Sequence, residues 1–126
     1  MTGDESRPPM RLLNLTPHEV TILSEAGTAL TIAPGGPPAR VELSRGHLGS
    51  IEVDGTQVDL GWSSTNGRVI DLPAAESDQL IIVARLVAEH APDRDDLVFP
   101  DDLVRNAAGV IEGCRRLSRL QDDPQQ

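Results

Sequence analysis

The feature that most constrains this chain is how often glycine and proline interrupt it. The sequence holds 11 Gly and 10 Pro in 126 residues, and both residue types break regular structure. The short segments between them alternate polar and apolar residues, as at residues 19–22 and 28–32. Alternation with a period of two is typical of strands with one buried face. We therefore expect a mostly β fold (β-rich α+β), a small barrel or sandwich of short antiparallel strands with one short helix.

Turn signals divide the chain into strands at 11–15, 19–22, 28–32, 39–43, 51–53, 58–60, 68–72, 80–84, 96–99, 103–105 and 110–112. Hairpins are predicted around Gly27, Asp54-Gly55 and residues 106–109, since Gly accepts a positive φ. The segment 80–84 is continuously apolar, which indicates a central strand buried on both faces. Better helix formers follow until Pro92, and they predict the one short helix. Pro100 is expected to end the strand before it.

The domain boundaries follow from composition. Residues 1–10 are polar and contain Pro, so we expect a disordered lead there. Residues 11–118 are expected to form a single domain of ordinary size, and residues 119–126 a flexible tail.

Charge and composition exclude several classes of function. The net charge is -9, all 11 basic residues are Arg, and Trp62 and Phe99 are the only aromatic residues. Direct nucleic-acid binding needs clustered cations and stacking aromatics, so it is not expected. Cys114 is the only cysteine, which rules out an internal disulfide and fits a reducing compartment, so we expect the cytoplasm. No apolar run is long enough to cross a membrane; no cofactor and no metal site are predicted.

Five groups of residues carry a family resemblance. They are Asn14-Leu15-Thr16-Pro17-His18; Ile32-Ala33-Pro34 with Gly36 and Ala39-Arg40-Val41; residues 80–88; residues 94–98 with Pro100; and Val104-Arg105, Gly109-Val110-Ile111 and Gly113-Cys114-Arg115. These resemble a family of short uncharacterised proteins from bacteria and their phages. Ala84 stands where that family commonly has Ser. The resemblance implies one continuous unit and a regulatory or phage–host accessory role, and it implies no activity.

The densest polar cluster is Asn14, Thr16 and His18 beside Pro17. It permits a small-molecule site in which His18 titrates near neutral pH. It equally permits a corner in which Asn and Thr side chains satisfy backbone groups, and such residues usually serve turns.

Cys114 has Arg115 beside it, and a neighbouring guanidinium favours the thiolate that a nucleophile needs. A lone cysteine is more often a small buried side chain. Arg85, Arg94 and Arg115 are further candidates for binding an anionic ligand, or for ordinary ion pairs. The three histidines are too far apart in sequence for a local metal motif.

We therefore expect a non-enzymatic ligand- or protein-binding module whose partner is an unknown small molecule or protein. One alternative is a small hydrolase or transferase that uses Cys114 or His18. A second alternative is an acidic mimic of nucleic acid that binds a basic protein, since residues 89–102 hold six carboxylates and one Arg.

Overall fold

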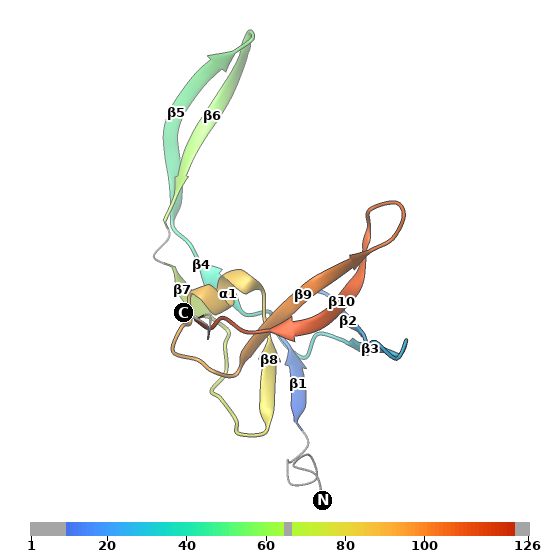
Figure 1. Cartoon of the computed structure of the whole chain (residues 1–126). Helices are drawn as coiled ribbons and strands as arrows, with labels where there is room; N and C mark the ends of the chain where they lie inside the picture. Colours follow the sequence, from blue (N-terminus) through green and yellow to red (C-terminus); the bar gives the residue numbers. More distant parts are fainter. Residues whose placement is uncertain (1–9, 65–66, 123–126) are drawn as a thin grey trace, which may run out of the picture.

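A computed structural model describes residues 10–64 and 67–122 of the chain (Figure 1). Its largest element is a six-stranded sheet in the order β1-β8-β9-β10-β2-β3. The six strands are β1 (Arg11–Asn14), β8 (Gln79–Ile82), β9 (Leu97–Arg105), β10 (Ile111–Ser118), β2 (Val20–Leu23) and β3 (Ala29–Ile32). A bridge between Asn14 and Pro34 joins the end of β1 to the chain just after β3. The sheet therefore nearly closes on itself as a small barrel, and the mostly β class is confirmed.

Strand β8 is the centre of the core. Ile81 and Val83 pack with Leu97, Phe99 and other residues in one buried cluster, whereas Ile82 packs with Val20, Val98 and Cys114 in a second. Successive side chains of a strand point to opposite faces, so β8 supplies both clusters. Ile81, Ile82 and Val83 have no exposed surface, which confirms the prediction of a strand buried on both faces.

The single helix covers one side of that core. It is α1 (Arg85–Glu89), and its buried residues Val87 and Ala88 pack on the first cluster. The helix begins at Arg85, after the two residues that follow β8, and ends at Glu89, three residues before Pro92. One short helix was expected at this place, and the structure confirms it.

The pairing of the strands differs from the antiparallel arrangement that we expected. β1 pairs with β8, β8 with β9, and β10 with β2 in parallel, whereas β9–β10 and β2–β3 are antiparallel. Local turn signals predict only neighbours in sequence, and each parallel pair joins strands that are separated by a crossover. The sheet is therefore mixed.

Strand β9 continues through Pro100, where we had expected it to stop. Pro100 is paired with Leu117 of β10. On its other side β8 pairs only with Leu97 and Val98, so β9 has already become an edge strand at Pro100. A proline is tolerated at such an edge because its missing N–H is not needed there.

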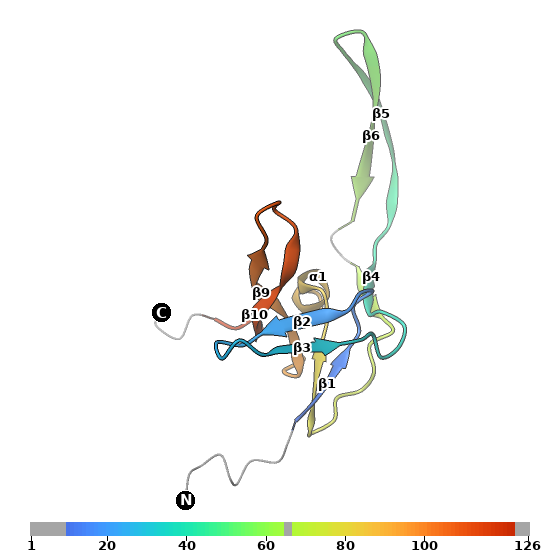
Figure 2. The ribbon, with the colours of Figure 1, turned by 90° about the vertical axis from the view of Figure 1, so that its right-hand side faces the viewer.

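Two smaller pairs of strands complete the fold. β4 (Arg40–Glu42) pairs with β7 (Arg68–Ile70), and Val41 and Val69 pack against the first core cluster. β5 (Arg45–Val53) and β6 (Thr56–Ser63) form a long hairpin. This hairpin, residues 45–63, projects away from the sheet in both views (Figures 1 and 2); we call it the arm, and the rest of the described chain the body.

The predicted ends of the chain fall partly outside the structure. Residues 1–9 and 123–126, which are all but one residue of the expected lead and half of the expected tail, lie outside the described residues. Strands run from Arg11 to Ser118, and residues 119–122 that follow are neither strand nor helix.

Candidate functional site

Asn14 is the most completely bonded polar side chain of the predicted cluster. It is 1% exposed. Its Nδ2 donates to the carbonyl oxygens of His18 and Ile32, both at 2.9 Å. Its Oδ1 accepts from the backbone N–H of Thr16 at 2.9 Å and lies 2.7 Å from the Thr16 hydroxyl. Because both donors and the acceptor oxygen are in use, Asn14 has no group left for a ligand.

The contacts of Asn14 tie three segments together. They join the end of β1, the turn at residues 16–18 and the end of β3. His18 takes part through its backbone carbonyl, and its exposed side chain makes no hydrogen bond to another described residue. This geometry is that of a structural corner, in which Asn and Thr side chains replace backbone partners at a bend.

Cys114 is placed as a core residue. It is 1% exposed, and its Sγ lies 3.6 Å from the carbonyl oxygen of Thr21, to which the thiol donates. Burial raises the pKa of the Cys114 thiol, so the uncharged thiol is favoured. A nucleophile needs the thiolate, and here the effect of burial outweighs the backbone hydrogen bonds from residues 101 and 116 that would favour it.

The candidate arginines lie in separate contacts. Arg85 pairs with Glu89 at 3.3 Å and its guanidinium lies 5.4 Å from the centre of the Phe99 ring. Arg94 donates two hydrogen bonds of 2.8 Å to the buried carboxylate of Asp96. This fork lowers the pKa of Asp96 and raises the pKa of Arg94. Arg115 is exposed, and no hydrogen bond or ion pair joins it to another described residue.

The acidic stretch 89–102 is largely engaged within the chain. Besides Glu89 and Asp96, Asp101 accepts from the Ser118 hydroxyl at 2.6 Å, and Asp102 pairs with Arg116 at 3.4 Å. These contacts use carboxylates that a mimic of nucleic acid would present to its partner.

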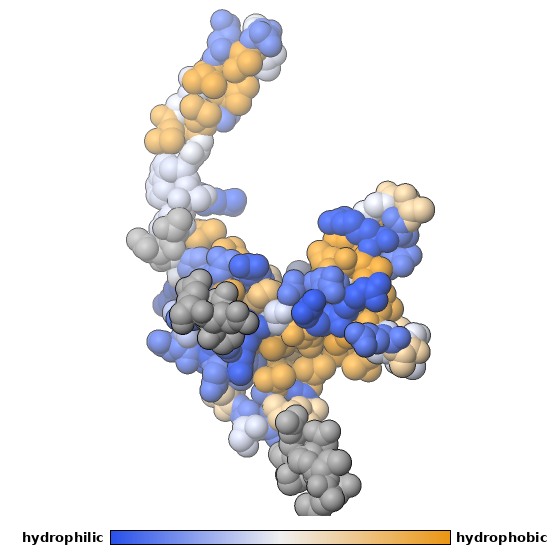
Figure 3. Space-filling model, viewed as in Figure 1, coloured by the Kyte–Doolittle hydropathy of each residue, from blue (hydrophilic) through white to orange (hydrophobic). Residues whose placement is uncertain are grey.

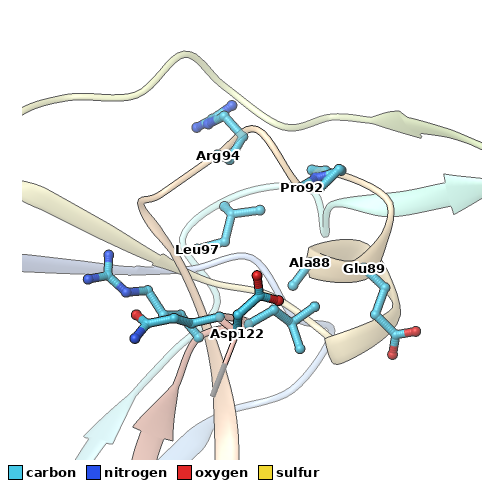
Figure 4. A pocket seen from close by; sticks show the side chains of 10 residues that line it. Ala88, Glu89, Pro92, Arg94, Leu97 and Asp122 are labelled. Carbon is cyan, nitrogen blue, oxygen red and sulfur yellow. The ribbon is translucent and has the colours of Figure 1, made fainter. Parts of the chain in front are cut away.

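A cavity of about 530 Å³ lies between α1, the chain after it and the segment 119–122. Figure 4 shows Leu97 and Ala88 between the chain that carries Arg94 and the segment that carries Asp122. Arg119 holds that segment in place by donating to the carbonyl oxygen of Asp95 at 2.8 Å. A second cavity, of about 140 Å³, lies beside Cys114. The candidate site residues Arg94 and Cys114 thus line different cavities.

The arm presents a different kind of surface. Its residues alternate so that one face is apolar and the other polar. The apolar face holds Ile51, Val53, Val58, Leu60 and Trp62, and each of these residues is 39–48% exposed. The opposite face holds Arg45, His47, Ser50, Glu52, Gln57 and Asp59. Figure 3 shows hydrophobic residues along the outer part of the arm with no other element over them.

No residue of either arm strand is buried. A two-stranded hairpin is at best marginally stable in water, and independent stability needs a third strand or a covering layer. Contiguous exposed apolar patches larger than a few hundred Å² mark interaction surfaces in soluble proteins. The arm therefore combines an apolar face that no described residue covers with an architecture that would gain stability from cover.

Local geometry holds the arm in shape. At its tip, Asp54 and Gly55 both have positive φ, 49° and 82°, as the tight two-residue turns of hairpins require. On the apolar face Trp62 lies across Gly46: a Cβ at Gly46 would be 2.5 Å from the indole nitrogen. Glycine is needed there because only a bare backbone lets the ring lie flat on the strand.

The base of the arm is fixed to the body. The Ser64 N–H donates to the Ser44 carbonyl oxygen at 2.8 Å, and Glu42 of β4 pairs with Arg68 of β7 at 3.6 Å. Gly67 packs so closely on Val41 and Glu42 that a Cβ would clash with both. The arm thus leaves the body from a small sheet that is itself packed on the core.

Sequence reasoning placed none of its site residues on the arm. The hairpin at Asp54-Gly55 was expected and is confirmed, and the alternation of Val58, Leu60 and Trp62 signalled one apolar face. That pattern does not say whether another element covers the face, and this is what the structure adds.

Comparison with known proteins gives no further guide. No protein family, no curated protein and no solved structure matches this chain. The family resemblance described above stays a prediction. Among the described residues no three His, Cys, Asp or Glu side chains are grouped to hold a metal ion. In the same part of the chain no helix is long and apolar enough to span a membrane.

Proposed function

We propose that this protein is a non-enzymatic protein-binding module that docks its partner on the apolar face of the arm. The observation that carries the proposal is the exposure of five large apolar side chains on one face of a hairpin that nothing in the described chain covers. Burying such a face removes apolar area from water, at roughly 25 cal/mol per Å².

The surroundings of the site residues that the sequence predicted favour this proposal over a catalytic or small-molecule role. Both N–H donors of the Asn14 side chain and its acceptor oxygen already form hydrogen bonds with backbone groups of this chain. Cys114 is buried with a raised pKa. A hydrolase or transferase needs an activated nucleophile and a base within hydrogen-bonding reach of it, and the Sγ of Cys114 instead bonds a backbone carbonyl.

Photo-crosslinking in expressing cells tests the proposal. Benzoylphenylalanine is placed at Val58, on the apolar face, or at Gln57, the next residue and on the polar face. Both positions are exposed, so both variants are expected to fold. We expect protein adducts from Val58, identified by mass spectrometry, and several times fewer from Gln57.

The two positions differ only in the face that they report, which makes Gln57 the matched control. Adducts of equal yield from both positions would indicate random collision. If position 58 gave no adduct with any protein, the arm would not be a docking element and the proposal would be overturned.

A further inference from the structure

We propose that the protein docked on the arm is a second copy of this chain, with the two apolar faces packed together and the two arms antiparallel about a twofold axis. This inference rests on the proposed function and names its partner. It follows from three properties of the arm: the chemistry of its apolar face, the distribution of its charges and the cover that a two-stranded hairpin lacks.

The apolar face is complementary to itself. Its large side chains are all uncharged, and the charged residues of both arm strands, Arg45, Glu52 and Asp59, lie on the other face. A twofold contact brings the same patch of both subunits together. Packing two such faces therefore buries no charge, and the polar residue of this face, Thr56, is paired with Val53 at the tip, at the end of the face.

The face carries no side chain at Gly49, near the middle of β5. Gly49 is paired with Leu60, and a Cβ built on Gly49 would meet nothing within 4 Å. An apolar side chain of a second arm can enter this space. Interdigitating side chains across a spacing of about 10 Å are how two β layers pack face to face.

The charges of the arm favour the antiparallel orientation. Arg45 is at the base, and Glu52 and Asp54 are at the tip. No ion pair or side-chain hydrogen bond joins any of the three to another described residue. Arg45 and Glu52 lie on the outer faces of such a pair. Antiparallel arms set the base of one beside the tip of the other, so opposite charges attract each other across the two layers. Parallel arms would bring like charges together, which is unfavourable.

A second copy supplies the cover that the arm lacks. Two paired arms form a two-layer unit of four strands, which meets the minimum for an independently stable β structure. Nine residues of β5 span about 30 Å at the usual rise per residue, so the arms can overlap while both bodies stay outside the contact.

The expected affinity is modest. The patch offers a few hundred Å² per copy, less than the roughly 800 Å² per partner of a standard interface. We therefore expect a reversible dimer with a Kd of about 1–100 μM. The chain should be monomeric well below this concentration and dimeric well above it.

The chain carries its own reporter of this contact. Trp62 is the only tryptophan and lies on the apolar face at 45% exposure. Its emission shifts to shorter wavelength when water is removed from the indole. Sedimentation velocity and Trp62 emission are measured on the full chain across the concentration range above. We expect the dimer fraction and the blue shift to rise together.

Val58→Glu and Gln57→Glu are the matched variants, because they place the same charge at neighbouring positions on opposite faces. We expect Val58→Glu to be monomeric throughout, with no change of emission, and Gln57→Glu to dimerise within about threefold of the parent Kd, as an exposed charge far from the contact allows. Circular dichroism checks that both variants fold. An equal loss of dimer affinity in both variants would overturn the proposal that the apolar faces form the contact.

The orientation is tested by reversing charges. Arg45→Glu is expected to weaken the dimer by about two- to fivefold, the range of exposed charge pairs. Adding Glu52→Arg to the same chain is expected to recover part of the affinity, since the tip then carries a cation beside Asp54 that faces the anion at the base. If the two changes weaken the dimer additively, the antiparallel arrangement is wrong.

The inference and the proposed function fail differently. A chain that stays monomeric up to about 500 μM, far above the expected Kd, while position 58 crosslinks a different protein, overturns the second copy and supports the proposed function. A monomeric chain with no adduct from position 58 overturns both.

Discussion

The two long hairpins of this protein are built alike and are used differently. β9–β10 and β5–β6 both turn on a glycine of positive φ, Gly109 and Gly55. In β9 the residues Leu97, Val98 and Phe99 are buried, because β8 pairs with the start of the strand and α1 packs beside it. In the arm no residue is buried.

The difference shows that alternation sets which face of a hairpin is apolar, whereas topology decides whether that face is covered. β9–β10 enters the six-stranded sheet through parallel neighbours on both sides, β8 and β2. The arm is inserted between β4 and β7 and has no neighbour of its own. One hairpin therefore stabilises the body, and the other keeps its apolar face exposed.

The largest expected effect comes from making the same substitution in both hairpins. Leu97 is 3% exposed in the core, and Leu48 is 68% exposed in the arm. Leu97→Ala should lower the free energy of unfolding by about 2–5 kcal/mol, as for other buried leucines. Leu48→Ala should change it by less than about 0.5 kcal/mol. Urea denaturation measures both, and similar losses would contradict the contrast between the hairpins.

Removing the side chain of Asn14 is expected to have the next largest effect on the free energy of unfolding. Asn14→Ala leaves the N–H of Thr16 and the carbonyl oxygens of His18 and Ile32 without this partner. We expect a loss of about 2–4 kcal/mol, because buried polar groups without partners are costly. His18→Ala keeps the carbonyl and should stay within about 0.5 kcal/mol of the parent. A large loss of stability in His18→Ala but not in Asn14→Ala would show that the imidazole ring, and not the Asn14 side chain, stabilises the corner.

Breaking the Arg94–Asp96 pair is expected to lower the free energy of unfolding by a smaller amount, and this amount depends on pH. The fork from Arg94 lowers the pKa of Asp96 in the folded state. Its contribution to stability is therefore complete above the unfolded pKa of about 3.9. That contribution is lost as the pH falls through the lower folded pKa.

Asp96→Asn should consequently be less stable than the parent at neutral pH, by about 1.5–3 kcal/mol for a hydrogen bond to a charged group. The difference should shrink on acidification below about pH 4. Asp95→Asn is the control, since Asp95 is the exposed neighbour. A difference that does not change with pH would show that the carboxylate charge is not what stabilises this loop. Unfolding curves at several pH values measure it.

The smallest effect on the body is expected when the arm is removed. Arg45 and Ser63 are paired at its base, so a short Gly-containing turn can replace residues 46–62. The shortened chain should unfold cooperatively, within about 1 kcal/mol of the monomeric Val58→Glu variant, since loop length alone changes the free energy little. A shortened chain without cooperative unfolding would show that the body depends on the arm.

Much of the fold could be predicted because it depends on local signals. The apolar run at 80–84, the helix before Pro92 and the turns at Gly27 and Gly55 are set by neighbouring residues, and the structure confirms them. The parallel pairing of Cys114 with Ile22 could not be predicted. It depends on which distant strands meet, and alternation carries no information about that.

The candidate site was predicted less well for a related reason. The sequence around Asn14, Thr16 and His18 is the same whether these side chains bind a ligand or form hydrogen bonds to the backbone at a bend. Only the bonds to His18 and Ile32 carbonyls separate the two cases. The exposed face at Val58 was equally ambiguous, because its significance depends on an element that is absent above it among the described residues.

The neighbours of β10 also bear on how the chain acquires its structure. Cys114 bonds the backbone of Thr21, 93 residues earlier in the sequence. Domains dominated by such distant contacts fold in milliseconds to seconds, whereas a hairpin forms in about 1–10 μs. On a ribosome, β2 has to wait until β10 has been synthesised, and the arm strands emerge well before that moment. The apolar face of the arm is thus exposed on the nascent chain before the body can close.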